Sequence, residues 1–136
     1  MASDFDRRVI EEFRANGRRA GELMSNSQRL LLLTTQGARS GQTRTTPMMF
    51  VADGERLIVI ASNAGASSHP AWYLNLVAHP EVVVEVDGRK YSARASVLAG
   101  AERERVWRRV LAEAPFFEQH QAKIERQIPL VALLPA

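Results

Sequence analysis

The sequence predicts a small α+β protein, mainly β with helices, centred on an antiparallel β-barrel of about six strands. Short runs of apolar and β-branched residues recur along the chain and are separated by turn residues, which is typical of strands. Two Asp-Gly pairs, Asp53-Gly54 and Asp87-Gly88, lie between such runs and indicate tight hairpins. Closure into a barrel would remove the exposed edges of so short a sheet, and an open α+β sandwich is the alternative.

Composition and charge narrow the class of protein. The chain has 136 residues, of which 46% are hydrophobic and 24% are charged, so a single globular domain is expected. Within it, residues 1–28 are expected to form a helix and a connector, and residues 29–136 the barrel. The net charge of +3 favours an anionic ligand without choosing one. Cysteine is absent, which excludes disulfides, thiolate metal sites and cysteine nucleophiles.

An amphipathic helix is predicted from Asp4 to about Asn16, because apolar residues recur there at helical spacing between charged ones. Its apolar stripe consists of Phe5, Val9, Ile10 and Phe13. We expect this stripe to dock on the barrel or on a partner subunit, and a membrane-surface helix is the alternative because arginine is plentiful here. No run approaches the roughly 20 apolar residues that span a bilayer, so a cytoplasmic location is expected, with membrane association as the alternative.

Three strands are predicted to follow as a meander. The first, LLLLTTQ at residues 30–36, is a continuous apolar and β-branched run that is too short for a helix. The second is expected at residues 43–51, after a glycine-rich turn, and the third at residues 57–62.

The second half of the chain alternates helices with strands. A small-residue loop at residues 63–68 leads into a short helix that starts at Pro70 and ends before Pro80. A second hairpin turns at Asp87-Gly88, with alternate valines on one face. The remaining predicted elements are helices at residues 101–114 and 116–127 and a closing strand at residues 128–135.

Several common functional motifs are missing. GARSG differs from the nucleophile elbow G-x-S-x-G, and neither G-x-G-x-x-G, G-x-x-x-x-G-K nor H-E-x-x-H occurs. The histidines, His69, His79 and His120, have no metal-like spacing, so no metal is expected. The basic residues are not interleaved with aromatics along a strand, so no nucleic-acid partner is expected.

The loop between the first two strands, TTQGARSGQTRTTP, is the best candidate site. Arg39 and Arg44 offer guanidinium forks suited to phosphate or carboxylate, and small residues let a ligand approach the backbone. Thr45 and Thr46 add hydroxyl groups, and Pro47 fixes the chain where the strand resumes. A solvated hairpin tip is the alternative, but so many polar groups in one loop favour anion binding.

A second candidate is SNAGASSHPAWYLNL, a small-residue loop that leads into a helix N-terminus. Free backbone N–H groups at such a place favour an anion or a polar ring edge. Trp72 and Tyr73 bring flat faces, although aromatics at helical spacing more often belong to the core. Asn75 lies on the same face as Trp72 and could pair with the amide-like edge of a heterocycle.

Four stretches, LLLTTQGARSGQTRTTPMMF, DGERLIVIASNAG, HPAWYLNLVAHPEVVVEVDG and RQIPLVALLP, resemble the deazaflavin-dependent nitroreductase family of actinobacteria, in the same order. The resemblance implies a split β-barrel that binds reduced coenzyme F420, a deazaflavin. It further implies hydride transfer to an electron-poor small-molecule acceptor, such as an activated alkene, a quinone or a nitro compound, and a homodimer. The alternatives are FMN as the cofactor, because it shares the phosphate and the tricyclic ring, and a deazaflavin carrier without turnover.

The resemblance also implies site residues. The residues matching those that bind the cofactor's phosphate and acidic tail are Ala38, Arg39, Ser40, Arg44, Thr45, Thr46, Pro47, Met48 and Met49. Those matching the lining of its ring are Ile60, Ala61, Ser62 and Asn63, and those packed against it are Ala71, Trp72, Tyr73, Leu74 and Asn75. Phe117 matches an aromatic near the substrate entrance, where Trp72 is also expected to contact substrate.

The sequence departs from the family pattern at several positions. Many relatives have a basic residue in place of Ala38 and another in place of Ser68, so fewer charges are expected on the tail. Relatives that reduce nitroimidazoles tend to have tyrosines around Phe117 and His120, and this chain has none there. The expected proton donor is therefore His120, Ser62 or water, since a histidine with a pKa near neutrality suits proton transfer.

Overall fold

The computed structural model describes residues 4–16 and 30–136. In this part of the chain, six antiparallel strands close into a barrel in the order β1-β2-β3-β6-β5-β4, with β4 paired to β1. The strands are β1 (Leu30–Gln36), β2 (Thr43–Asp53), β3 (Arg56–Ile60), β4 (Glu81–Val86), β5 (Arg89–Val97) and β6 (Leu130–Pro135). The predicted barrel is confirmed, and the open sandwich is excluded.

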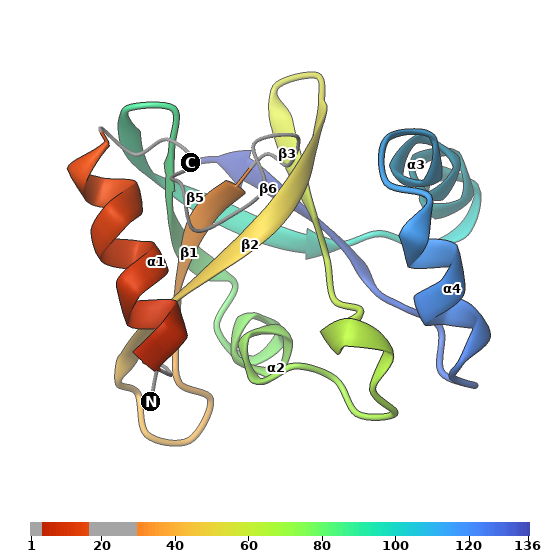
Figure 1. The fold of residues 1–136 in the computed structure, drawn as a ribbon, viewed down its shortest axis with the longest axis horizontal. Coiled ribbons are helices and arrows are strands. Elements are labelled where there is room, and N and C mark those ends of the chain that lie inside the picture. Colours follow the sequence, from red (N-terminus) through yellow and green to blue (C-terminus); the bar gives the residue numbers. More distant parts are fainter. Residues whose placement is uncertain (1–3, 17–29) are drawn as a thin grey trace.

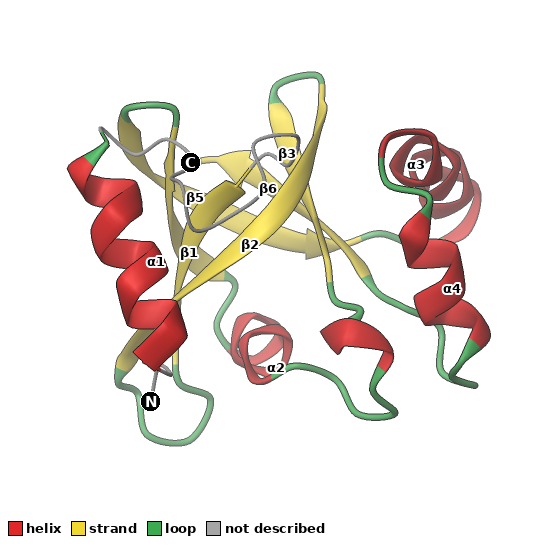
Figure 2. Ribbon diagram, in the orientation of Figure 1, coloured by secondary structure: helices red, strands yellow, loops and turns green. Residues whose placement is uncertain are grey.

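Helices cover the barrel on two sides and at one end (Figures 1 and 2). They are α1 (Asp4–Ala15), the short 3-10 helix η1 (Asn63–Gly65), α2 (Ala71–Ala78), α3 (Gly100–Glu113) and α4 (Phe116–Ala122). In Figure 1, α1 lies along one side, α3 and α4 lie on the other, and α2 lies below the barrel between the β1–β2 loop and η1. No helix in residues 4–16 or 30–136 is long and apolar enough to cross a membrane.

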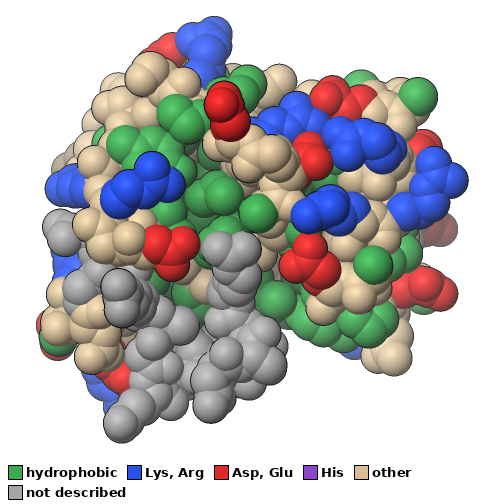
Figure 3. All heavy atoms as spheres, turned by 90° about the horizontal axis from the view of Figure 1, so that it is seen from above, with side chains coloured by type: hydrophobic (Ala, Val, Ile, Leu, Met, Phe, Trp, Pro, Cys, Tyr) green, Lys and Arg blue, Asp and Glu red, His purple; other side chains and the backbone are tan. Residues whose placement is uncertain are grey.

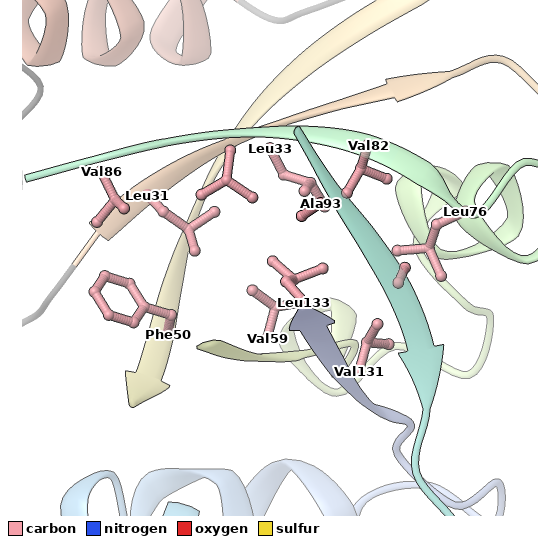
Figure 4. Packing of buried hydrophobic residues seen from close by; sticks show 12 residues of the cluster. Leu31, Leu33, Phe50, Val59, Leu76, Val82, Val86, Ala93, Val131 and Leu133 are labelled. Carbon is pink, nitrogen blue, oxygen red and sulfur yellow. The ribbon is translucent and has the colours of Figure 1, made fainter. Parts of the chain in front are cut away.

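Burial on both faces explains the continuous apolar runs. In β1, Leu31 and Leu33 belong to the barrel interior, whereas Leu30 and Leu32 pack with the apolar face of α1. Strands β3 and β6 are built in the same way, because α3 and α4 cover their outer faces. Figure 4 shows interior side chains from these strands and from α2 pointing toward one another. Such strands lose the polar alternation of a half-exposed sheet.

One hairpin turn forms as predicted and the other is displaced by one residue. Asp87 and Gly88 have φ values of 48° and 79° between the paired residues Val86 and Arg89, as the favoured two-residue hairpin turn requires. In the β2–β3 hairpin, Asp53 pairs with Arg56, so residues 54 and 55 form the turn instead of the Asp53-Gly54 pair. Asp53 is retained in β2 because its carboxylate accepts hydrogen bonds from Arg56 and Arg105.

Charged residues connect this hairpin to α3. Arg56 lies 2.9 Å from Asp53 and 2.8 Å from Glu102, and Arg105 lies 3.2 Å from Asp53. Hydrogen bonding from Arg105 is the largest influence on Asp53 and, together with Arg56, lowers the pKa of that carboxyl below its usual value against the opposing effect of burial. Figure 3, which views the molecule from above, shows acidic and basic side chains mixed on the side where α3 lies.

Helix α1 docks on the barrel through most of its predicted stripe. Val9, Ile10 and Phe13 are buried, with Phe13 only 1% exposed, but Phe5 in the first turn is 51% exposed and is not part of this contact. The three buried side chains are therefore covered by the barrel and are not available to a membrane surface in this arrangement. The connector predicted before residue 29 lies outside the described residues, so the division at residue 28 stays a prediction.

The last predicted helix is shorter than expected. Helix α4 ends at Ala122, whereas the sequence pattern extended it to residue 127. The Gln121 side chain donates to the Arg126 carbonyl oxygen at 2.8 Å and accepts from the Ile128 N–H at 2.9 Å. These bonds stabilise an irregular segment that carries the chain from α4 into β6.

Candidate functional site

A cavity of about 640 Å³ lies between α1, the β1–β2 hairpin and α2. Its hairpin wall consists of Thr35, Gln42, Thr43, Arg44, Thr45 and Thr46. Its helical walls consist of Asp6, Arg7, Ile10, Glu11 and Arg14 from α1 and Ala71, Trp72 and Asn75 from α2. Arg44 from the first candidate segment and Trp72 and Asn75 from the second therefore line one cavity.

The β1–β2 loop is a defined turn. The Gly37 N–H donates to the Gln42 carbonyl oxygen at 2.8 Å, and the Gln42 N–H donates to Ser40 Oγ at 3.1 Å. A Cβ at position 37 would lie 2.5 Å from Ser40 Oγ, so a side chain there would require the Ser40 hydroxyl to move. Arg39 is exposed in this loop and is not among the described residues that line the cavity, whereas Arg44 is exposed and lines it.

Asn75 connects the loop to the barrel. Its Oδ1 accepts from the Ala38 N–H at 3.0 Å, and its Nδ2 donates to Thr35 Oγ1 at 3.2 Å. Both Asn75 and Thr35 are buried. The Asn75 amide therefore holds the hairpin wall of the cavity in place, and its predicted contact with a heterocycle stays a prediction.

On the opposite wall, α1 carries charges of both signs. Arg14 Nε and Nη2 donate to the two carboxylate oxygens of Glu85 at 3.1 and 2.8 Å. Glu85 lies on β4 with a side chain only 1% exposed, and hydrogen bonding to it raises the pKa of Arg14. This bidentate pair joins α1 to the barrel and partly neutralises the charge that Arg14 brings to the cavity.

A second group of predicted residues gathers where η1 meets α4. Ser62 Oγ lies 3.3 Å from His120 Nδ1, and the ring of Phe117 meets that of His120 edge to face at 5.5 Å. Ser62 and Phe117 are each 5% exposed. Phe117 packs among the residues between the barrel and α3 and α4. Its predicted place near the substrate entrance stays a prediction.

Many of the predicted site residues do not line this cavity. Those not among the described cavity-lining residues are Ala38, Arg39, Ser40, Pro47, Met48, Met49, Ile60, Ala61, Ser62, Asn63, Tyr73, Leu74, Phe117 and His120. Met48 packs against the barrel interior and Met49 against the apolar residues under α1. Ile60 and Ala61 are buried, whereas Asn63 and Leu74 are exposed.

Sequence reasoning missed the α1 wall of the cavity. Arg7, Glu11 and Arg14 lie opposite the apolar stripe, and the amphipathic pattern assigns them to solvent. Such a pattern identifies the face that is buried but does not show what stands across from the polar face. No local signal in the sequence could have placed these side chains opposite Arg44.

His69 lies in the segment that precedes α2. Its Nδ1 is 3.2 Å from Arg126 Nη1, and its ring stacks on Tyr73 with centroids 4.7 Å apart. Because a guanidinium group only donates, Nδ1 must be the accepting nitrogen of a neutral ring. Burial and, second, the charge of Arg126 lower the pKa of His69 below 6.5.

Stability should therefore depend on pH through His69. The folded state binds this proton more weakly than the unfolded state, so the free energy of unfolding is expected to fall as the pH drops below 6.5 and to level off below the folded pKa. Urea unfolding at a series of pH values measures this, and His69→Gln should remove this part of the slope. His79→Gln is the matched control, and equal slopes in His69→Gln and the unmodified protein would contradict the expectation.

Comparisons with known proteins show which family and which fold the chain shares. The family model described as F420H(2)-dependent quinone reductase matches residues 5–135. A putative F420H(2)-dependent quinone reductase of Mycobacterium tuberculosis is 32% identical over 105 residues, which cover 77% of this chain and 88% of that protein. A solved F420-H2 dependent reductase is 34% identical, with a TM-score of 0.71 over 76% of this chain and 92% of its own. Another structure, described as a domain-swapped dimer, is 31% identical, with a TM-score of 0.74 over 93% of this chain and 95% of its own.

Proposed function

The chain belongs to the F420H(2)-dependent quinone reductase family, and we propose that it transfers a hydride from reduced coenzyme F420 to a quinone-type acceptor. Membership makes it an oxidoreductase whose cofactor is coenzyme F420. The family, the enzyme class and the cofactor that the sequence motifs implied are confirmed. Within the proposal, quinones are the first acceptors to test, and activated alkenes and nitro compounds follow.

The observation that supports this function best is the cavity lined jointly by Arg44, threonine hydroxyls and Trp72. Coenzyme F420 has a phosphate and glutamyl carboxylates at one end and a flat heterocycle at the other. A guanidinium fork beside hydroxyl groups suits the anionic end, and a volume of about 640 Å³ is usual for a small-molecule site. Asp6 and Glu11 lie on the α1 wall and oppose an anion, so we place the tail against the hairpin wall.

The remaining groups would orient the reactants. When bound and reduced, the deazaflavin supplies the hydride, and the chain supplies position and electrostatics. We assign Trp72 to support of the ring, because it lines the cavity from α2 beside the hairpin. We assign the role of proton donor to the pair formed by Ser62 Oγ and His120 Nδ1, which lies where η1 meets α4.

Binding and turnover together test the function. Purified protein is mixed with reduced coenzyme F420 or with FMN, and retention after desalting is measured by absorbance. Menadione is then added, and oxidation of the reduced cofactor is followed against a protein-free control. We expect retention of coenzyme F420 in preference to FMN and protein-dependent oxidation by menadione.

Two results would overturn the proposal. Tight retention of coenzyme F420 without oxidation across quinones, activated alkenes and nitro compounds would indicate a carrier of the cofactor. Preferential retention of FMN would indicate a flavin reductase on the same barrel. A homodimer is supported by the domain-swapped neighbour but stays a prediction for this chain, as do membrane contact and cytoplasmic location.

A further inference from the structure

Arg126 lies in the irregular segment between α4 and β6 and contacts a single distant stretch of chain. Its Nη1 donates to the Ala61 carbonyl oxygen at 3.2 Å, and its Nη2 donates to the Ser62 carbonyl oxygen at 2.9 Å. Nε and Nη2 reach the Ala66 carbonyl oxygen at 3.2 and 3.0 Å, and Nη1 reaches His69 Nδ1 at 3.2 Å. One side chain thus connects positions on both sides of η1.

These contacts use the whole guanidinium group. An arginine side chain has five N–H donors and no acceptor. The five contacts above involve Nε once and Nη1 and Nη2 twice each, so each N–H has an acceptor within the protein. Arg126 therefore differs from Arg44, whose exposed guanidinium lines the cavity, and its chemistry is that of a structural clamp rather than an anion site.

The clamped stretch has an unfavourable backbone conformation. Asn63, Ala64 and Gly65 have successive φ values of 51°, 55° and 80°. A side chain in this left-handed region is strained, and such residues persist where the surroundings determine them. Arg126 contacts Ser62 just before these residues and Ala66 just after them, so its bonds close the turn from both ends.

The clamp acts directly on Ser62. Arg126 bonds the Ser62 carbonyl oxygen, while Ser62 Oγ meets His120 Nδ1 at 3.3 Å. The turn also lies against α4, because a Cβ at position 65 would be in van der Waals contact with His120 Cα at 3.5 Å. Displacement of Ser62 by about 1 Å would separate the pair, and misplacement on that scale can cost about a hundredfold in rate.

We propose that Arg126 is a positioning residue that holds Ser62 against His120 and thereby keeps this proton-transferring pair assembled. Its catalytic consequence rests on the proposed function, but the positioning itself does not. Arg126 acts through Ser62, because its N–H groups all have acceptors within the protein.

The test is a double-mutant cycle with Arg126→Met and Ser62→Ala. With reduced coenzyme F420 and menadione, Arg126→Met should lower kcat at least about tenfold and change the cofactor dissociation constant by less than about threefold. In the Ser62→Ala background, Arg126→Met should have little further effect on kcat, because the residue through which it acts is gone. Arg108→Met, at an exposed arginine of α3, is the matched control and should leave kcat unchanged.

A readout without turnover separates this inference from the proposed function. In NMR spectra of protein labelled with ¹⁵N-histidine, the His120 ring nitrogens should shift in Arg126→Met in the same direction as in Ser62→Ala. Arg126→Lys keeps the charge but has fewer donors in a different arrangement, so it should give an intermediate shift of the His120 signals. This variant replaces Arg126→Met in the test if the methionine variant does not fold. Fully additive losses of kcat, unchanged His120 signals or a weaker cofactor affinity at unchanged kcat would overturn the assignment.

Discussion

Replacing Arg44 with alanine should raise the dissociation constant for coenzyme F420 by about tenfold to a hundredfold, because a charge-assisted contact is worth about 1.5–3 kcal/mol. Arg44 is the arginine of the β1–β2 hairpin wall that lines the cavity, beside the hydroxyls of Thr43 and Thr45. The alanine removes the charge without disturbing a buried group, since the side chain is exposed. Fluorescence or absorbance titration with the cofactor measures the change.

Arg39→Ala is the matched control for this prediction. Arg39 has the same side chain in the same loop, but it is not among the described residues that line the cavity. If Arg39 contacts only the far end of the acidic tail, Arg39→Ala should lower the affinity for coenzyme F420 less than Arg44→Ala does. That loss of affinity should increase with the length of the tail. If neither variant changed the affinity for coenzyme F420, the hairpin would not be part of the binding site. Equal losses of affinity would indicate that the tail lies across the tip of the loop.

The barrel was predictable because its signals are local. Alternation placed Val82, Val84 and Val86 on one face, and all three belong to the interior. The same alternation assigns Glu85 to solvent, yet its side chain is only 1% exposed because α1 covers it and Arg14 pairs with it. Periodicity therefore identifies a face correctly but does not show whether a distant helix covers the opposite face.

The candidate site was predictable in part. The residue types of Arg44 and Trp72 suggested an anion and a flat ring, and they line one cavity. Their residue chemistry alone left a solvated hairpin tip as an alternative, and the family resemblance supplied the cofactor. Arg126 begins the stretch RQIPLVALLP, which carried part of the resemblance, but no role was predicted for it. A single arginine between two elements has no periodicity, and its partners lie about 60 positions earlier in the chain. Asn75 was predicted as a ligand contact and does line the cavity, but its hydrogen bonds to Thr35 and Ala38 were not foreseen.

Phe13→Ala should release α1 from the barrel and weaken cofactor binding at the same time. Phe13 is 1% exposed and packs with Val9, Ile10, Leu30 and Leu32, and truncating a buried phenylalanine costs about 3–5 kcal/mol where the surroundings stay in place. A helix of 12 residues docked mainly through three apolar side chains can detach before that full cost is reached. Detachment removes one wall of the cavity, so the dissociation constant for coenzyme F420 should rise. The free energy of unfolding of the barrel should fall by less than the full cost of truncating a buried phenylalanine.

Phe5→Ala provides the matched control, since Phe5 is the same residue type on the same helix and is 51% exposed. Hydrogen exchange of the α1 amides should become fast in Phe13→Ala and stay slow in Phe5→Ala, while the barrel amides remain protected in both. This pattern would also support the division into an N-terminal helix and a barrel that folds without it. If Phe13→Ala instead lowered protection throughout the chain, the helix and the barrel would form one cooperative unit. The loss of cofactor affinity would then reflect the stability of the whole domain rather than the absence of one wall.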